Sequence, residues 1–211
     1  MESLLGIACK DFVIVAADMM NIHSIMVMKD DEDKIYKVAD RLIMGVCGEA
    51  GDTTQYAEYI AKNMQLYKMR NGYELSPYAA ANFTRGNLAE YLRTRSPYNV
   101  NMLLAGYSDE KGPQLYFLDY LASMHEMRFT SHGYGGMFSL SIMDRYYKRD
   151  MTVEEGYELL KKCVREIKKR FVVNLPNFTV KLVDKDGVKV LPPITQKDLV
   201  LEDAKKSEGE K

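Results

Sequence analysis

Tryptophan is absent from this chain, and cysteine is rare. The three cysteines, Cys9, Cys47 and Cys163, are odd in number, widely spaced and surrounded by apolar residues. This pattern indicates reduced thiols in a core rather than a disulfide framework. Because neither a CxxC nor an HxxxH spacing occurs, the sequence offers no zinc-ligand motif, and we expect neither a metal nor a cofactor.

The sequence also has no excess of one charge and no long apolar run. The 29 lysines and arginines nearly balance the 30 aspartates and glutamates, and the net charge of -1 gives no general attraction to phosphate backbones or anionic lipids. No run approaches the ~18 apolar residues of a membrane-spanning helix. Residues Met1, Glu2 and Ser3 lack the basic start and apolar stretch of a secretory signal. We therefore expect a protein that stays inside the cell and binds neither nucleic acid nor membrane.

The overall amino-acid composition is typical of a single globular domain. Of the 211 residues, 46% are hydrophobic and 28% are charged, with 6 prolines and 14 glycines. These values exclude a disordered or collagen-like chain, and the length fits one domain. After Pro192 and Pro193 the sequence becomes mostly charged. We expect a domain over residues 1–193, followed by a mobile tail over residues 194–211.

Short apolar runs predict strands at the start, in the middle and near the end of the chain. The predicted strands are residues 4–9, 12–17, 22–28, 34–38, 41–47, 100–107, 114–119, 123–131, 178–183 and 188–191. The run 12–17 does not alternate between apolar and polar residues, so both of its faces should be buried in the centre of a sheet. The Met-rich run 25–28 fits packing in a core or an interface.

Apolar residues at spacings of three and four predict four helices. The first runs from Asp52 to residues 71–72, the second begins at Ser76 and carries apolar residues to position 92, the third covers residues 137–147, and the fourth follows Thr152. Asp52 with Gln55 and Thr152 with Glu155 each have the spacing of a capping box. The order of strands and helix pairs favours an α+β fold of two packed sheets covered by helices on both outer faces.

One further pattern is spread along the whole chain, over residues 5–7, 15–18, 34, 45–52, 65–76, 103–107, 143–147 and 170–176. In these segments the sequence resembles the proteasome beta subunits of the N-terminal nucleophile hydrolase superfamily. The resemblance covers roughly residues 1–191 and is spread over every predicted element, so it is more specific than any short motif. It implies the four-layer αββα sandwich of that superfamily, which agrees with the element order.

The resemblance also implies what the site residues would do. Active members attack the peptide bond with the hydroxyl of an N-terminal threonine, whose free α-amine takes the proton. An aspartate, a lysine and a glycine amide that forms the oxyanion hole support this step. The matching positions here are Asp18, Lys34 and Gly48, which keep the family residue, and Glu2, Tyr134, Phe171 and Asn174, which replace the threonine, a serine, an aspartate and a second serine.

These replacements predict that the site is not catalytic. A carboxylate at Glu2 has no hydroxyl with which to attack, and its charge would lie where an anionic intermediate develops. We also expect Met1 to be retained, with no propeptide to remove. The resemblance then implies a structural beta subunit of the 20S proteasome core particle in cytoplasm and nucleus. Its partners would be other beta and alpha subunits in four stacked seven-membered rings, which degrade ubiquitin-tagged and unfolded proteins.

Other interpretations of the same residues stay open at this stage. Ser3 lies one position from the nucleophile and would make the chain an active amidohydrolase if two residues were removed before it. Cys47 could act as a nucleophile, although its apolar neighbours favour a buried structural thiol. Asp18 and Lys34 could be a retained buried ion pair, or Lys34 could belong to a solvated cluster with the acidic residues 30–33.

Overall fold

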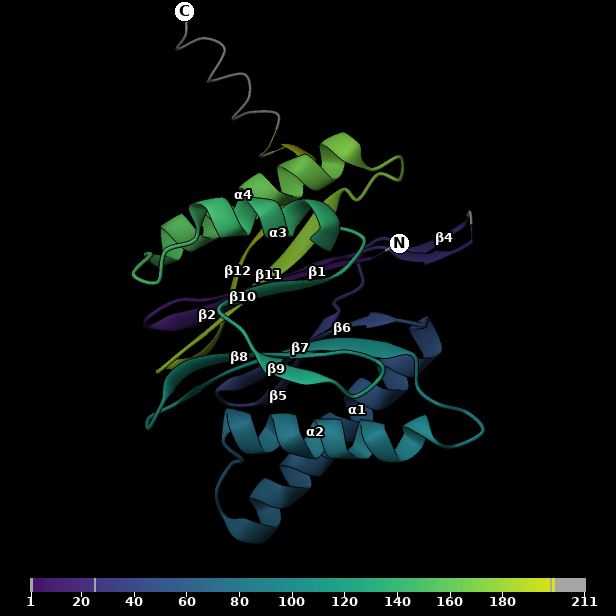
Figure 1. Ribbon diagram of the computed structural model, residues 1–211, viewed down its shortest axis with the longest axis vertical. Coiled ribbons are helices and arrows are strands. Elements are labelled where there is room, and N and C mark those ends of the chain that lie inside the picture. Colours follow the sequence, from purple (N-terminus) through teal and green to yellow (C-terminus); the bar gives the residue numbers. More distant parts are fainter. Residues whose placement is uncertain (1, 25, 198, 200–211) are drawn as a thin grey trace, which may run out of the picture.

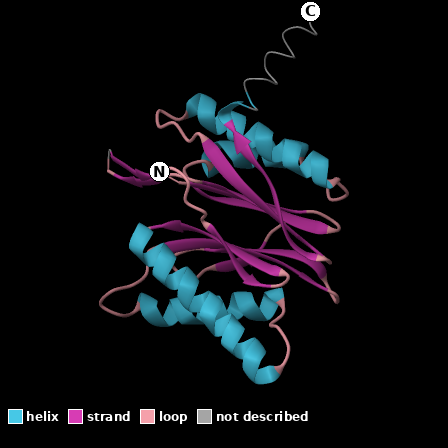
Figure 2. Ribbon diagram, turned by 180° about the vertical axis from the view of Figure 1, so that it is seen from behind, coloured by secondary structure: helices cyan, strands magenta, loops and turns pink. Residues whose placement is uncertain are grey.

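The computed structural model describes residues 2–24, 26–197 and 199. They form four layers in the order helices, sheet, sheet, helices (Figures 1 and 2). Both sheets are antiparallel and have five strands, and a separate two-stranded ribbon lies beside them. This is the α+β sandwich expected from the sequence. None of the helices in the described residues is both long and apolar enough to cross a membrane.

The first sheet has the strand order β10-β1-β2-β11-β12. Its strands are β1 (Ser3–Ala8), β2 (Phe12–Asp18), β10 (Phe129–Gly133), β11 (Asn177–Asp184) and β12 (Gly187–Thr195). All seven residues of β2 are buried, and β2 pairs with β1 on one side and β11 on the other. The prediction that residues 12–17 form a central strand is therefore confirmed.

The second sheet has the strand order β5-β6-β7-β8-β9 and faces the first. Its strands are β5 (Ile35–Ala39), β6 (Leu42–Gly48), β7 (Val100–Ser108), β8 (Gly112–Leu118) and β9 (Met124–Glu126). A layer of buried side chains from both sheets fills the space between them, and it includes Leu4, Val15, Ile43 and Leu103. Burial of these side chains holds the two sheets face to face.

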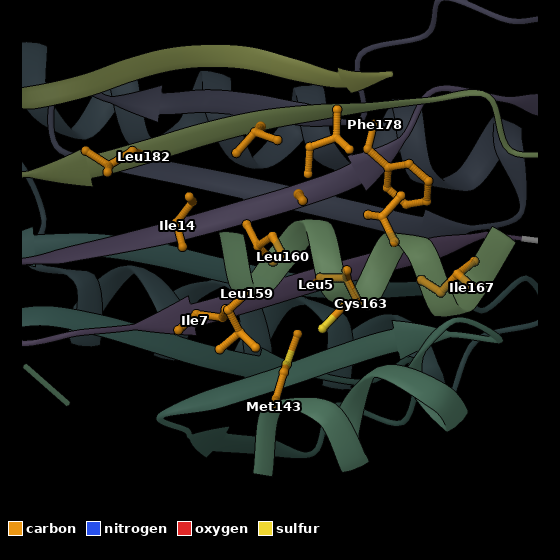
Figure 3. Close-up of a cluster of buried hydrophobic side chains, with 14 of the residues drawn as sticks. Leu5, Ile7, Ile14, Met143, Leu159, Leu160, Cys163, Ile167, Phe178 and Leu182 are labelled. Atoms are coloured by element: carbon orange, nitrogen blue, oxygen red, sulfur yellow. The ribbon is translucent and has the colours of Figure 1, made fainter. Parts of the chain in front are cut away.

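Two helix pairs cover the outer faces, as expected. The helices are α1 (Ala50–Asn71), α2 (Pro77–Leu92), α3 (Gly136–Tyr146) and α4 (Val153–Arg170). Helices α3 and α4 pack on the first sheet through the cluster in Figure 3, in which Cys163 of α4 lies close to Leu5 of β1 and Met143 of α3. Helices α1 and α2 pack on the second sheet through their own buried cluster.

The predicted caps were partly right. Thr152 and Glu155 form the expected capping box, and the Ser76 side chain accepts a hydrogen bond from the Ala79 N–H at 3.2 Å. The box predicted for Asp52 is wrong, because α1 begins two residues earlier and its N-cap makes no side-chain cap bond. The Asp52 carboxylate instead accepts a hydrogen bond from the N–H of Asn99, at 2.8 Å.

Two predicted strands are wrong because each is a pair of strands. Residues 22–28 divide into β3 (Asn21–His23) and β4 (Met26–Lys29), which pair with each other in the separate ribbon. Residues 123–131 divide into β9 and β10, which belong to different sheets. An apolar run carries no signal for this crossing, because β9 is selected by pairing with β8 and β10 by pairing with β1.

Strand β12 continues beyond the end expected at Pro192 and Pro193 and reaches Thr195. Two prolines are tolerated here because β12 is an edge strand, and its pairing with β11 contains an irregularity near this point. Ile194 and Leu199 are buried against the first sheet and its helices. The packed domain therefore extends past residue 193, and the remainder of the expected tail, residues 198 and 200–211, lies outside the described residues.

Candidate functional site

Four of the positions singled out by the sequence meet at one end of the two sheets. Glu2 comes directly before β1, Asp18 is the last residue of β2, Lys34 comes directly before β5, and Gly48 is the last residue of β6. The four residues are linked to one another by hydrogen bonds or ion pairs. The fold thus brings together residues that lie up to 46 positions apart in the chain.

Asp18 is the most deeply buried member of this group. Its side chain is 1% exposed. One oxygen, Oδ1, accepts a hydrogen bond from the N–H of Ser3 at 2.7 Å. The other, Oδ2, accepts from the N–H of Met20 at 3.2 Å and from Lys34 Nζ at 2.9 Å. Because a buried carboxylate must be satisfied by donors, these three contacts explain how the charge is tolerated.

Lys34 uses all three of its ammonium donors. Its Nζ atom lies 2.9 Å from Asp18 Oδ2, 2.7 Å from the carbonyl oxygen of Met20 and 3.0 Å from Glu2 Oε1. Burial by itself would lower the pKa of Lys34, but the two carboxylate charges and their hydrogen bonds outweigh it, so the pKa is raised. Lys34 is therefore a charged member of a buried network, which decides against a solvated cluster with residues 30–33.

Glu2 spans the two remaining groups with its carboxylate. Oε1 pairs with Lys34 Nζ, and Oε2 accepts a hydrogen bond from the Gly48 N–H at 2.5 Å. The carbonyl oxygen of Glu2 accepts from the N–H of Tyr134 at 3.1 Å, which fixes the backbone as well. The Glu2 carboxylate is thus bound to both Lys34 and the Gly48 amide, the two groups that support catalysis in the family that the sequence resembles.

Two glycines allow this close approach. Gly48 has a φ of +146°, and a Cβ atom there would lie 2.2 Å from the carbonyl oxygen of Asn99. Gly133 has a φ of +77°, and its Cβ would lie 2.1 Å from the carbonyl oxygen of Glu2. Both values are far inside van der Waals contact, so a larger residue would displace the backbone that surrounds Glu2.

Ser3 faces the opposite side of β1 from Glu2. Neighbouring side chains in a strand point to opposite faces, so Glu2 and Leu4 face the space between the sheets, while Ser3 and Leu5 face the helices. A Cβ on Gly135, directly before α3, would meet the Ser3 hydroxyl at 2.4 Å. Within the described residues this hydroxyl is buried without a hydrogen-bond partner. It therefore does not point toward Lys34 and Gly48.

The other predicted site residues are divided between two places. Tyr134 is exposed and lines the same pocket as Glu2 and Gly48. Phe171, which follows α4, packs its ring edge against Phe138 with the centroids 5.8 Å apart, and Asn174 is exposed on the loop after α4. Neither is among the described residues that line the pocket around Glu2. The structure therefore joins five of the seven positions and leaves two outside.

An open pocket of about 810 Å³ borders the network. It is lined by Glu2, Asn21, Ile22, His23, Cys47, Gly48, Glu49, Ala50, Gly51, Asn99, Asn101, Gly133 and Tyr134.

Cys47 is 2% exposed, and burial raises its pKa well above that of a free thiol. A protonated, buried thiol is a poor nucleophile, which supports the structural interpretation of Cys47. Among the described residues, no group of three or more His, Cys, Asp or Glu side chains could hold a metal ion.

Sequence reasoning missed two parts of the network. The carbonyl oxygen of Met20 completes the coordination of Lys34, and Gly133 gives room to the backbone of Glu2. A main-chain acceptor such as that of Met20 leaves no trace in the side-chain sequence. Gly133 could have been suspected, because it lies beside Tyr134 in a glycine-rich turn between a strand and a helix.

Comparisons with known proteins agree with this geometry. A family model described as "Proteasome subunit" matches residues 2–183. Proteasome subunit beta type-2-A of Arabidopsis thaliana is 51% identical over 189 residues, which cover 90% of this chain and 92% of the relative. Proteasome subunit beta type-4 of Saccharomyces cerevisiae is 45% identical over 190 residues, covering 90% and 96%. Proteasome subunit beta type-2 of Dictyostelium discoideum is 45% identical over 195 residues, covering 91% and 98%. Similarity of this extent shows that the chain belongs to the proteasome beta subunit family.

Proposed function

We propose that this chain is a non-catalytic structural subunit of the beta ring in the 20S proteasome core particle. It takes the place of the beta type-2 and type-4 subunits of its relatives, between lateral beta neighbours and against an alpha ring, in four stacked rings of seven subunits. Its role is to close the ring and to wall off the chamber in which ubiquitin-tagged and unfolded proteins are degraded. We propose that these particles work in the cytoplasm and the nucleus.

One observation carries the proposal that the chain is not catalytic. The carboxylate of Glu2 lies on Lys34 Nζ at 3.0 Å and on the Gly48 N–H at 2.5 Å. A glutamate cannot supply an attacking hydroxyl. Its negative charge also fills the position at which a glycine amide would stabilise an oxyanion. The Ser3 hydroxyl faces the helices, so a shift of the nucleophile by one residue is not supported either.

The experiment restores the missing nucleophile. Glu2→Thr, in a chain whose Met1 is removed, provides a hydroxyl and a free amine beside Asp18 and Lys34, and it also frees the Gly48 amide. The chain is incorporated into particles whose other active sites are blocked and is treated with a threonine-directed epoxyketone. We expect no covalent label, because Tyr134 still lines the pocket and members of a catalytic unit act non-additively.

Robust labelling of the Glu2→Thr chain would show that the surrounding pocket is still competent and that only the nucleophile is missing, so the replacement at Tyr134 would be a neutral change. A different result would contradict the proposal itself. For the unmodified chain, an intact mass that corresponds to a start at Ser3, together with epoxyketone labelling, would identify it as an enzyme. Unblocked particles, in which catalytic neighbours react, serve as the positive control for the reagent.

A further inference from the structure

The contacts of the Glu2 side chain have the form of a bound ligand. Each carboxylate oxygen has its own donor: Oε1 lies on an ammonium group, and Oε2 lies on a backbone N–H. The donors come from β6 and from the residue before β5, whereas Glu2 precedes β1. A free acetate or formate ion would be held in the same way, because such donors recognise any carboxylate that fits.

We propose that the Gly48 amide and the Lys34 ammonium form a carboxylate-binding site, that Glu2 is its built-in ligand, and that a chain lacking this side chain binds a small carboxylate from solution in its place. The inference goes beyond the proposed function, because it concerns binding and holds whether or not the subunit has a reaction to perform.

The two donors are held in place by contacts that do not involve Glu2. Lys34 Nζ is also bonded to Asp18 and to the carbonyl oxygen of Met20. Gly48 pairs with Val100 of β7, and the next N–H, of Glu49, bonds to the carbonyl oxygen of Asn99. Since each donor keeps these supports when the Glu2 side chain is shortened, the site should remain organised without its ligand.

The charge balance of the site favours an anion of moderate affinity. Asp18 offsets the charge of Lys34, so removal of Glu2 leaves a neutral pair beside a free N–H. Helix α1 begins at Ala50, which lines the same pocket, and a helix N-terminus carries a partial positive charge. We therefore expect weak, reversible binding of a monocarboxylate rather than tight binding of a multivalent anion.

A small carboxylate can reach the site from solvent. The Glu2 side chain is 25% exposed, although Lys34 behind it is almost completely buried. The open side belongs to the pocket of about 810 Å³ that Asn101 and Tyr134 also line. An acetate ion is much smaller than this pocket, so entry requires no rearrangement of the sheets. In the natural chain the same route ends at the Glu2 carboxylate, which repels incoming anions.

The experiment compares assembled particles that contain the natural chain, Glu2→Ala or Glu49→Ala. Glu49 lines the same pocket and makes no side-chain cap bond, so its replacement removes one negative charge without opening the Gly48 and Lys34 donors. The probe is fluoroacetate at neutral pH. Its ¹⁹F line broadens when the ion exchanges onto a large particle. We expect the ¹⁹F line to broaden more with Glu2→Ala than with the other two samples. Unlabelled acetate should reverse this broadening, whereas chloride at equal ionic strength should not.

A density map of the Glu2→Ala particles in acetate locates the bound ion. Density between Gly48 N and Lys34 Nζ that is absent in chloride supports the proposal. Equal line broadening in the three samples, or acetate density only elsewhere, overturns it. If the Glu2→Ala chain enters particles only when acetate is present, the proposal is also supported. None of these results depends on epoxyketone labelling, so the proposed function is tested separately.

Discussion

Replacement of Asp18 by asparagine should destabilise the domain by about 3 kcal/mol. Breaking a buried ion pair costs about 3–5 kcal/mol, and the lower end applies because Lys34 keeps Glu2 at 3.0 Å as a second partner. An asparagine oxygen in place of Oδ2 can still accept from Met20 and Lys34. Its amide group then replaces Oδ1 and faces the N–H of Ser3, so two donors meet in a buried place.

This loss should be visible in thermal unfolding of the full-length chain, followed by circular dichroism at neutral pH. For a protein of this length, about 3 kcal/mol corresponds to a fall in Tm of about 6–12 °C. The control is Asp109→Asn, which removes an exposed ion pair with Arg41 and should leave Tm unchanged. A fall in Tm no larger than that of the control would refute the view that Asp18 and Lys34 act as a net stabilising pair.

The same variant predicts a change at alkaline pH. The raised pKa of Lys34 means that its contribution to stability is fully present below its unfolded-state value of 10.5 and is lost as the pH rises through the folded-state pKa. Because Asp18 is the largest of the influences that raise this pKa, Asp18→Asn should lower it. We therefore expect the alkaline loss of stability, which begins near the unfolded-state value of 10.5 in both chains, to be smaller and to end at a lower pH in the variant than in the natural chain. Identical alkaline profiles would contradict the assigned cause of the shift.

Three further predictions concern other parts of the structure. Gly133→Ala should cost about 2 kcal/mol or more, measured by Tm, because its Cβ would meet the Glu2 carbonyl oxygen and φ is +77°. Burial lowers the pKa of His132 from 6.5 to about 4, so the free energy of unfolding should fall by about 3 kcal/mol as the pH drops from 6.5 to 4. In His132→Gln this fall should be smaller, as measured by unfolding the protein at a series of pH values. Met28 is 65% exposed on the β3–β4 ribbon, so Met28→Asp should change the free energy of unfolding by no more than about 0.5 kcal/mol. It should lower incorporation into particles, as measured by native mass spectrometry.

Local sequence signals were sufficient for much of the fold. The non-alternating run 12–17 indicated a central strand, and β2 is buried on both faces. Spacings of three and four residues located the four helices, and the Thr152–Glu155 box fixed the start of α4. These features could be predicted because hydrophobic periodicity and capping depend on residues that are neighbours in the chain.

The family resemblance also predicted which residues form the site. It marked Glu2, Asp18, Lys34 and Gly48 before any geometry was known, and the structure places all four in contact as one network. It also grouped Phe171 and Asn174 with them, and in the structure these two lie outside the pocket around Glu2. Matching positions in a sequence therefore identified the centre of the site better than its edge.

Tertiary structure alone decided the features that depend on partners far away in the chain. The sequence predicts one strand over residues 123–131. In the structure these residues form β9, which pairs with β8, and β10, which pairs with β1 in the other sheet. The opposite orientations of Glu2 and Ser3 follow from the register of β1, because a shift by one residue would exchange the two faces. The meeting of the Glu2 carboxylate with Lys34 and with the Gly48 N–H likewise requires three strand ends to converge. Such contacts are set by sheet pairing and by burial of the shared core, and these are non-local interactions that no short stretch of sequence encodes.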